Sequence, residues 1–135
     1  MSRHDARIQA LEALYAADER GDDPEVDELS VRARRLVEGV WGRRTELDRA
    51  IEEAATGWRL ERMPVVDRNV LRLGLFELRH TDTPVGVVIS EAVEIAKAYS
   101  TARSGSFVNG VLGALAPARS GAGERAGERT RPRDG

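Results

Sequence analysis

The sequence predicts an all-α fold of six or seven helices without a sheet, and three observations support this prediction. Apolar residues recur at helical spacing along most of the chain, capping residues precede these stretches, and Gly or Pro follows them. The one β-branched run, residues 85–89, has no second strand to pair with, so we expect it to begin a helix. The rest of the fold is organised around residues 63–80, the expected central helix.

The central helix has an unusually wide apolar surface. Its apolar side chains cover more than half of the circumference: Val66, Val70, Leu71, Leu73, Leu75 and Leu78. We therefore expect this helix to pack against neighbours on more than one side, with Gly74 allowing one backbone to approach closely. The remaining strip, which we expect to face outward, carries Arg68, Arg72 and Arg79.

The N-terminal helix is expected to run from a Ser2 cap to about Arg20. Its buried stripe should comprise Ile8, Leu11, Leu14 and Tyr15. The same stripe continues toward the N-terminus as Arg3, His4 and Arg7. This first turn would present positive charge at the positive end of a helix, which suits phosphate. A frayed, solvated helix end with ordinary surface arginines is the alternative interpretation.

The remaining segments are predicted from the same signals. Further amphipathic helices should cover residues 29–41 and 45–58, followed by one turn at 59–62. We expect a loop over residues 101–106 and a last helix over 107–115. Arg32, Arg34 and Arg35 lie off the apolar face of the second helix and are expected to form a solvated surface. Residues 1–118 would form one helical domain, and residues 119–135, rich in Gly, Arg and Glu, a disordered tail.

Composition excludes several classes of protein. The 135 residues carry 21 basic and 23 acidic side chains, so any nucleic-acid site must be a local patch. There is no cysteine, no clustered pattern of metal ligands and no glycine-rich phosphate loop, so we expect neither metal, cofactor nor enzymatic activity. Glu77 falls inside the apolar arc of the central helix. We expect it to pair with an arginine or to cap a neighbouring backbone rather than to act as a tuned acid. Without a secretory signal or membrane span, the chain is expected to be cytoplasmic.

Four stretches of the sequence together resemble those of a known protein family. They are residues 7–15 (RIQALEALY), 66–78 (VDRNVLRLGLFEL), 89–97 (ISEAVEIAK) and 106–112 (SFVNGVL). Their order and spacing, over about residues 3–117, resemble the NusB family of transcription antitermination factors. The resemblance implies two small helical bundles sharing a core. It also implies binding to the boxA element of nascent ribosomal RNA transcripts, together with the ribosomal protein NusE, and read-through by RNA polymerase.

The resemblance also implies two functional surfaces. The RNA-binding surface would comprise the N-terminal basic turn and the start of the last helix: Arg3, His4, Arg7, Arg103, Ser104, Ser106 and Phe107. Arginines would bind phosphates, and the ring of Phe107 would either stack on a base or belong to the core. The NusE surface would lie near the first turn of the central helix, with Asp67, Tyr15 and Arg72.

Two departures from the family pattern bear on RNA binding. His4 and Asp5 interrupt what is often a denser run of basic residues in the family, whereas Arg103 stands where some relatives carry an acidic residue. These changes oppose each other in their effect on phosphate binding. The alternative function is a helical protein-interaction module with weak or lost RNA binding, self-associating as a homodimer through the same surface. A part of a ribosomal RNA methyltransferase is the third interpretation, and the absence of such a domain here argues against it.

Overall fold

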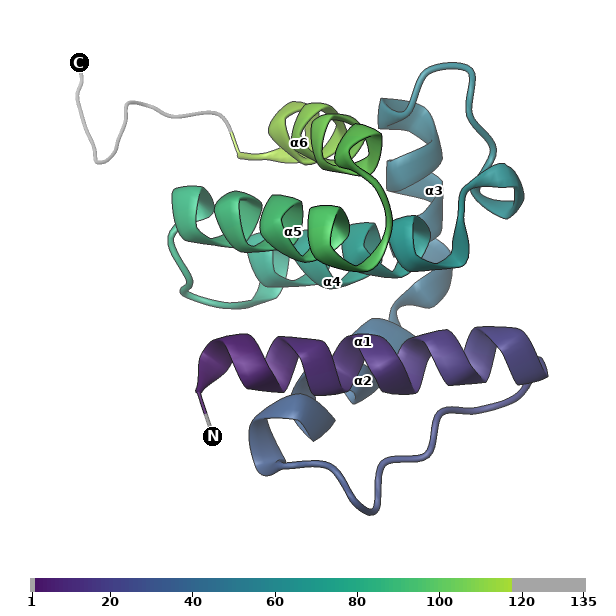
Figure 1. Ribbon diagram of the computed structural model, residues 1–135, viewed down its shortest axis with the longest axis vertical. Helices are drawn as coiled ribbons and strands as arrows, with labels where there is room; N and C mark the ends of the chain where they lie inside the picture. Colours follow the sequence, from purple (N-terminus) through teal and green to yellow (C-terminus); the bar gives the residue numbers. More distant parts are fainter. Residues whose placement is uncertain (1, 118–135) are drawn as a thin grey trace.

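The computed structural model describes residues 2–117, which form six α-helices and one short 3-10 helix (Figure 1). The elements are α1 (Arg3–Arg20), α2 (Val31–Gly42), α3 (Arg44–Ala54), η1 (Leu60–Arg62), α4 (Val65–His80), α5 (Val85–Tyr99) and α6 (Ala102–Leu115). The described part of the chain contains no strand, so the all-α prediction is confirmed. The predicted disordered tail, residues 119–135, lies outside the described residues.

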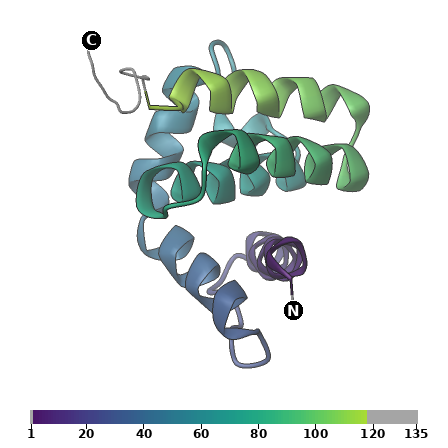
Figure 2. The same ribbon diagram turned by 90° about the vertical axis from the view of Figure 1, so that its left-hand side faces the viewer.

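The central position predicted for α4 is confirmed. This helix packs against each of the other five α-helices. In Figure 1, α1 and α2 lie on one side of α4, while α5 and α6 lie on the other. Figure 2 shows α1 nearly end-on with α2 beside it, apart from the group formed by α3, α4, α5 and α6. Two small helical groups therefore share one core helix.

Burial along α4 explains how it serves both groups. Residues 69–78 are all buried. A Cβ added to Gly74 would lie 2.7 Å from Cδ1 of Leu112, so the space at Gly74 is filled by a side chain of α6 and not by the neighbouring backbone that was expected. The prediction that Arg72 faces outward is wrong: it is only 5% exposed, whereas Arg79 is exposed.

The predicted helix starts are confirmed at α1 and α5. Ser2 caps α1, its Oγ accepting a hydrogen bond from the Asp5 N–H at 3.0 Å. The β-branched run after Pro84 is helical and begins α5, because Val88 and the later residues Ala92, Ile95 and Ala96 bury one face of it. Packing therefore overrides the β propensity of the run.

Two predicted boundaries are wrong. The loop expected over residues 101–106 is mostly helix, because Thr101 caps α6 by accepting a hydrogen bond from the Ser104 N–H at 3.1 Å. The third helix ends at Ala54 rather than continuing to Trp58, and Gly57 follows with a positive φ of 84°. Trp58 is consequently 51% exposed.

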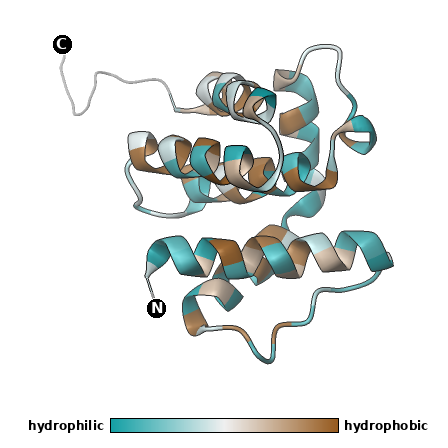
Figure 3. Cartoon of the chain, in the orientation of Figure 1, coloured by the Kyte–Doolittle hydropathy of each residue, from teal (hydrophilic) through white to brown (hydrophobic). Residues whose placement is uncertain are grey.

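Hydropathy follows this arrangement. Figure 3 shows brown, hydrophobic stretches where helices face one another, while α1 is teal at both ends. Within residues 2–117, no helix is long and apolar enough to cross a membrane.

Candidate nucleic-acid interface

The first turn of α1 is the first predicted RNA-binding patch, and it presents two of the three expected cations. Arg3 and His4 are exposed, directly after the Ser2 cap. They point to different sides of α1, since Arg3 lines a hollow shared with α2, whereas His4 lies against α5. The helix N-terminus adds partial positive charge to both.

Arg7 does not belong to this exposed patch, and its role as an RNA contact stays a prediction. It is 6% exposed and grips Glu77 with two hydrogen bonds, Nε to Oε2 at 2.7 Å and Nη2 to Oε1 at 2.8 Å. Its Nη1 also donates to Oε1 of Glu91 at 3.2 Å. The hydrogen bond to Glu77 raises the pKa of Arg7 against the opposing effect of burial. The predicted pairing of Glu77 with an arginine is confirmed.

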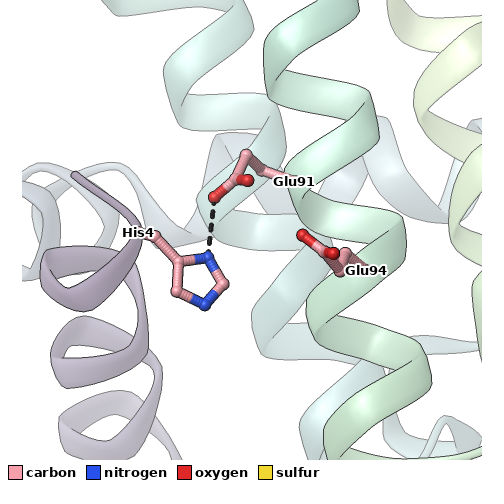
Figure 4. A group of neighbouring side chains, drawn as sticks. All are labelled: His4, Glu91 and Glu94. Carbon is pink, nitrogen blue, oxygen red and sulfur yellow. Dashed lines mark hydrogen bonds and ion pairs between the residues drawn. The ribbon is translucent and has the colours of Figure 1, made fainter. Parts of the chain in front are cut away.

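His4 is already engaged by acidic residues of α5. Its Nδ1 lies 3.0 Å from Oε1 of Glu91, and Glu94 stands beside them (Figure 4). The hydrogen bond with Glu91 raises the pKa of His4. The ligand atoms of these three side chains lie within 4.8 Å of one another, a proximity that sequence spacing concealed because α1 and α5 are far apart in the chain. The ion pairs with His4 and Arg7 explain the position of the Glu91 carboxylate without a metal ion.

The start of α6 is the second predicted patch, and again only part of it is accessible. Arg103 and Ser106 are exposed on the first turns. Ser104 is only 4% exposed, and its hydroxyl donates to Oδ2 of Asp67 at 2.9 Å. The Ser104 side chain therefore joins α6 to α4, and its RNA contact stays a prediction.

Phe107 combines the two interpretations that the sequence left open. It is partly buried against the core, and its ring meets Trp58 edge to face, with centroids 5.9 Å apart. Trp58 was expected inside the third helix, so an exposed aromatic ring next to Phe107 was not predicted. Gly57, immediately before it, is the sequence signal for a helix end that leaves Trp58 outside the helix. An exposed indole beside a partly exposed phenyl ring is suited to stacking on bases.

The predicted NusE surface is only partly exposed. Tyr15 is 41% exposed rather than buried in the stripe of α1. Asp67, expected at an exposed first-turn position, is 4% exposed and accepts the hydrogen bond from Ser104; its other oxygen, Oδ1, is buried without a partner among the described residues. Of the three predicted partner contacts, only Tyr15 presents a large surface.

Arg72 lies inside an ionic network rather than on a partner surface. Its guanidinium forms two hydrogen bonds with Asp48 of α3, at 2.8 and 2.9 Å, and one with Asp18 of α1 at 3.1 Å. Asp18 also accepts hydrogen bonds from Arg68 at 3.0 Å and Asn69 at 2.8 Å. Arg72 thus ties three helices together, and its role as a direct partner contact stays a prediction.

Comparison with known proteins agrees with this architecture. The model of the NusB family matches residues 4–117. A transcription antitermination protein NusB from Acidothermus cellulolyticus is 48% identical over 84% of this chain and 86% of its own length. The one from Symbiobacterium thermophilum is 43% identical over 90% of this chain and 94% of its own length.

Solved structures give the same result. NusB from T. maritima superposes with a TM-score of 0.77 at 36% identity, covering 86% of this chain and 91% of that one. A crystal structure of the antitermination factors NusB and NusE in complex with dsRNA contains a chain with a TM-score of 0.72 at 32% identity. The alignment covers 85% of this chain and 97% of that one.

The fold and these relatives define a small all-helical transcription antitermination protein, as the sequence predicts, and not an enzyme. The chain belongs to the NusB family.

Proposed function

We propose that this chain binds the boxA element of nascent ribosomal RNA transcripts together with a NusE ribosomal protein, and so promotes read-through by RNA polymerase. The observation that carries the proposal is the relative at 32% identity whose structure contains NusB, NusE and dsRNA. This role belongs to the cytoplasm, where transcripts are made. Self-association as a homodimer is the competing use of the same surface.

The accessible side chains of the two patches support single-stranded RNA as the ligand. Arg3 and Arg103 are exposed on the first turns of α1 and α6, where a side-chain charge and the helix terminus both attract phosphate. Trp58 and Phe107 offer adjacent aromatic rings near the second patch. Arginine for phosphates and aromatic rings for bases is the usual division of roles in single-strand binding.

The proposal is tested by titrating labelled boxA RNA and a scrambled RNA with the parent protein, in the presence and absence of NusE. We expect tighter binding of boxA, with NusE increasing the affinity. Trp58→Ala should weaken RNA binding by about 1–3 kcal/mol with little change in salt dependence, since stacking involves no ion release. Arg103→Ala should reduce the slope of log K against log salt by about 0.7.

Phe107→Ala is expected to behave like Trp58→Ala, with a control for stability. Because Phe107 also packs against the core, the melting temperature of the Phe107→Ala variant must be measured together with its affinity for RNA. Trp58 is half exposed, so its replacement tests stacking with less effect on folding. Absence of RNA binding by the parent with NusE present at low salt would reject the proposal. A concentration-dependent dimer would then favour the interaction module.

A further inference from the structure

A groove of about 890 Å³ opens between the first turns of α1 and α2 and the connection from α4 to α5. Arg3 stands at the α1 side, Arg32 and Arg35 stand on α2, and His80 lies at the end of α4. Leu36 and Phe76 contribute apolar surface between them. From the sequence, the three arginines of α2 were expected to form an ordinary solvated face, whereas in the structure Arg32 and Arg35 line this groove.

The groove is locally basic in a chain whose formal net charge is −2. Four arginines and two carboxylates line it, and one pair, Arg7 with Glu77, is mutually neutralised. This leaves Arg3, Arg32 and Arg35 against Asp82. Among residues 2–117, none of these three arginines forms an ion pair with a carboxylate, so their charge is available to a ligand.

The arrangement on α2 separates these arginines from their neighbour Arg34. Arg32 and Arg35 are three positions apart and so share one side of the helix. Arg34 points elsewhere and pairs with Glu38 at 3.4 Å and Asp27 at 3.8 Å. The first turn of α2 also contains no acidic residue, so its partial positive charge adds to the groove.

The opposite side of α1 has the reverse charge. There, Glu91 and Glu94 of α5 surround His4, and these carboxylates repel phosphate (Figure 4). A phosphate chain that contacts Arg3 therefore meets cations on the α2 side and carboxylates on the α5 side. The arginines at the rim offer charge to phosphates, while Leu36 and Phe76 beneath them are core residues only 7% and 8% exposed.

We propose that the RNA strand leaves the first turn of α1 through this groove, with Arg32 and Arg35 of α2 binding its phosphates alongside Arg3. The inference rests on the proposed function and extends the RNA-binding surface to a helix outside both patches. Since phosphate contacts carry no base information, the groove contributes affinity for RNA of any sequence rather than selection of boxA.

The test compares the double variant Arg32→Ala/Arg35→Ala with the matched control Arg34→Ala, using labelled boxA RNA and scrambled RNA at several salt concentrations. The double variant should reduce the salt slope by about 1.4, or about 0.7 for each lost single-strand contact. At low salt, it should weaken both RNAs by a similar factor, on the order of tenfold. Arg34→Ala removes a charge from the same helix and should leave the slope and the affinity unchanged.

Several outcomes would overturn the inference. The inference that the groove binds RNA is rejected if the double variant keeps the salt slope of the parent. It is also rejected if Arg34→Ala loses as much affinity per removed charge as the double variant does. If Trp58→Ala weakens RNA binding while the double variant does not, the groove fails and the proposed function stands. If the parent binds no RNA even with NusE, both fail together. All three arginines of α2 are exposed, and circular dichroism should show parental helicity for each variant.

Discussion

The two ends of the α1–α4 contact are joined by ion pairs of opposite orientation. Near the start of α1, Arg7 of α1 meets Glu77 of α4; near its end, Asp18 of α1 meets Arg68 and Arg72 of α4. The two helices therefore run antiparallel. Reversing α1 would place arginine against arginine and carboxylate against carboxylate, so the charge pattern specifies the direction of packing.

The ion pairs matter for the direction of packing because half of the buried side chains of α1 are small and do not fix the direction of the helix by their shape. Its buried residues are Ala6, Arg7, Ala10, Leu11, Leu14 and Ala17. Alanines can pack in many registers, whereas both ion pairs of opposite polarity can form in only one register. The ends also differ in burial: Arg7 and Glu77 have side chains 8% and 6% exposed, whereas Asp18 and Arg68 are both 17% exposed and only Arg72, at 6%, is as buried. The first end should therefore be more sensitive to mutation.

The largest effect is expected from Glu77→Ala. This change leaves the buried Arg7 guanidinium with only Glu91, which is partly exposed, so the free energy of unfolding should fall by about 3–5 kcal/mol. Urea denaturation followed by circular dichroism measures the loss. A decrease below about 1 kcal/mol would show that water replaces the lost carboxylate and that the two ends do not differ.

Arg72→Met should have the second largest effect, about 1–3 kcal/mol. The aspartates it leaves behind retain access to water, and Asp18 retains Arg68 and Asn69. The control is Arg79→Met, which removes the same charge from an exposed position of α4 and should change stability by less than about 0.5 kcal/mol. A loss at Arg72 greater than that of Glu77→Ala would reverse the proposed ranking of the two ends.

A smaller effect on the stability of the fold is expected when Asp18 is protonated. Burial alone would raise the pKa of the Asp18 carboxyl, but hydrogen bonds from Arg68 and Asn69 and the charge of Arg72 outweigh it and hold the pKa below its usual value. The resulting stability is complete above the unfolded pKa of about 4 and is lost as the pH falls through the lower folded pKa. Asp18→Asn should therefore show a weaker decline of melting temperature on acidification. Parallel declines for the two proteins would count against this assignment.

The smallest effect is expected at His4, and its pH dependence has the opposite sign. Its hydrogen bond with Glu91 raises the pKa of His4, so the stabilisation is present below about pH 6.5 and is lost as the pH rises through the folded pKa. The parent should lose slightly more melting temperature between pH 6 and pH 8 than His4→Gln does. Equal losses would mean that the exposed pair contributes nothing measurable.

The helices were predictable from sequence because apolar periodicity and caps are local signals. The central role of α4 followed from the width of its apolar arc, and the Ser2 cap was visible directly. The start of α6 was missed because residues 101–106 resemble a loop in composition. Only the folded chain places the Ser104 hydroxyl against Asp67 of α4, a contact across 37 positions.

The candidate site was less predictable, because the exposure of a charged residue depends on its distant partners. Arg3, His4 and Arg103 are exposed as expected, whereas Arg7 and Arg72 are buried among carboxylates from other helices. Helical spacing placed Glu77 inside the apolar arc of α4, and it placed Arg7 in line with the apolar stripe of α1, in a first turn expected to present positive charge. It contained no information on whether they face each other.

The antiparallel contact between α1 and α4 also determines an order of folding. α4, α5 and α6 follow one another through connections of a few residues, so their contacts close short loops. The Arg7–Glu77 bond instead joins positions 70 residues apart, and closing that loop costs more chain entropy. We therefore expect the helical hairpins of α4, α5 and α6 to form early and α1 to dock last. During synthesis, α1 and α2 can pack together as soon as both have emerged from the ribosome, whereas the contact of α1 with α4 forms only once α4 is complete.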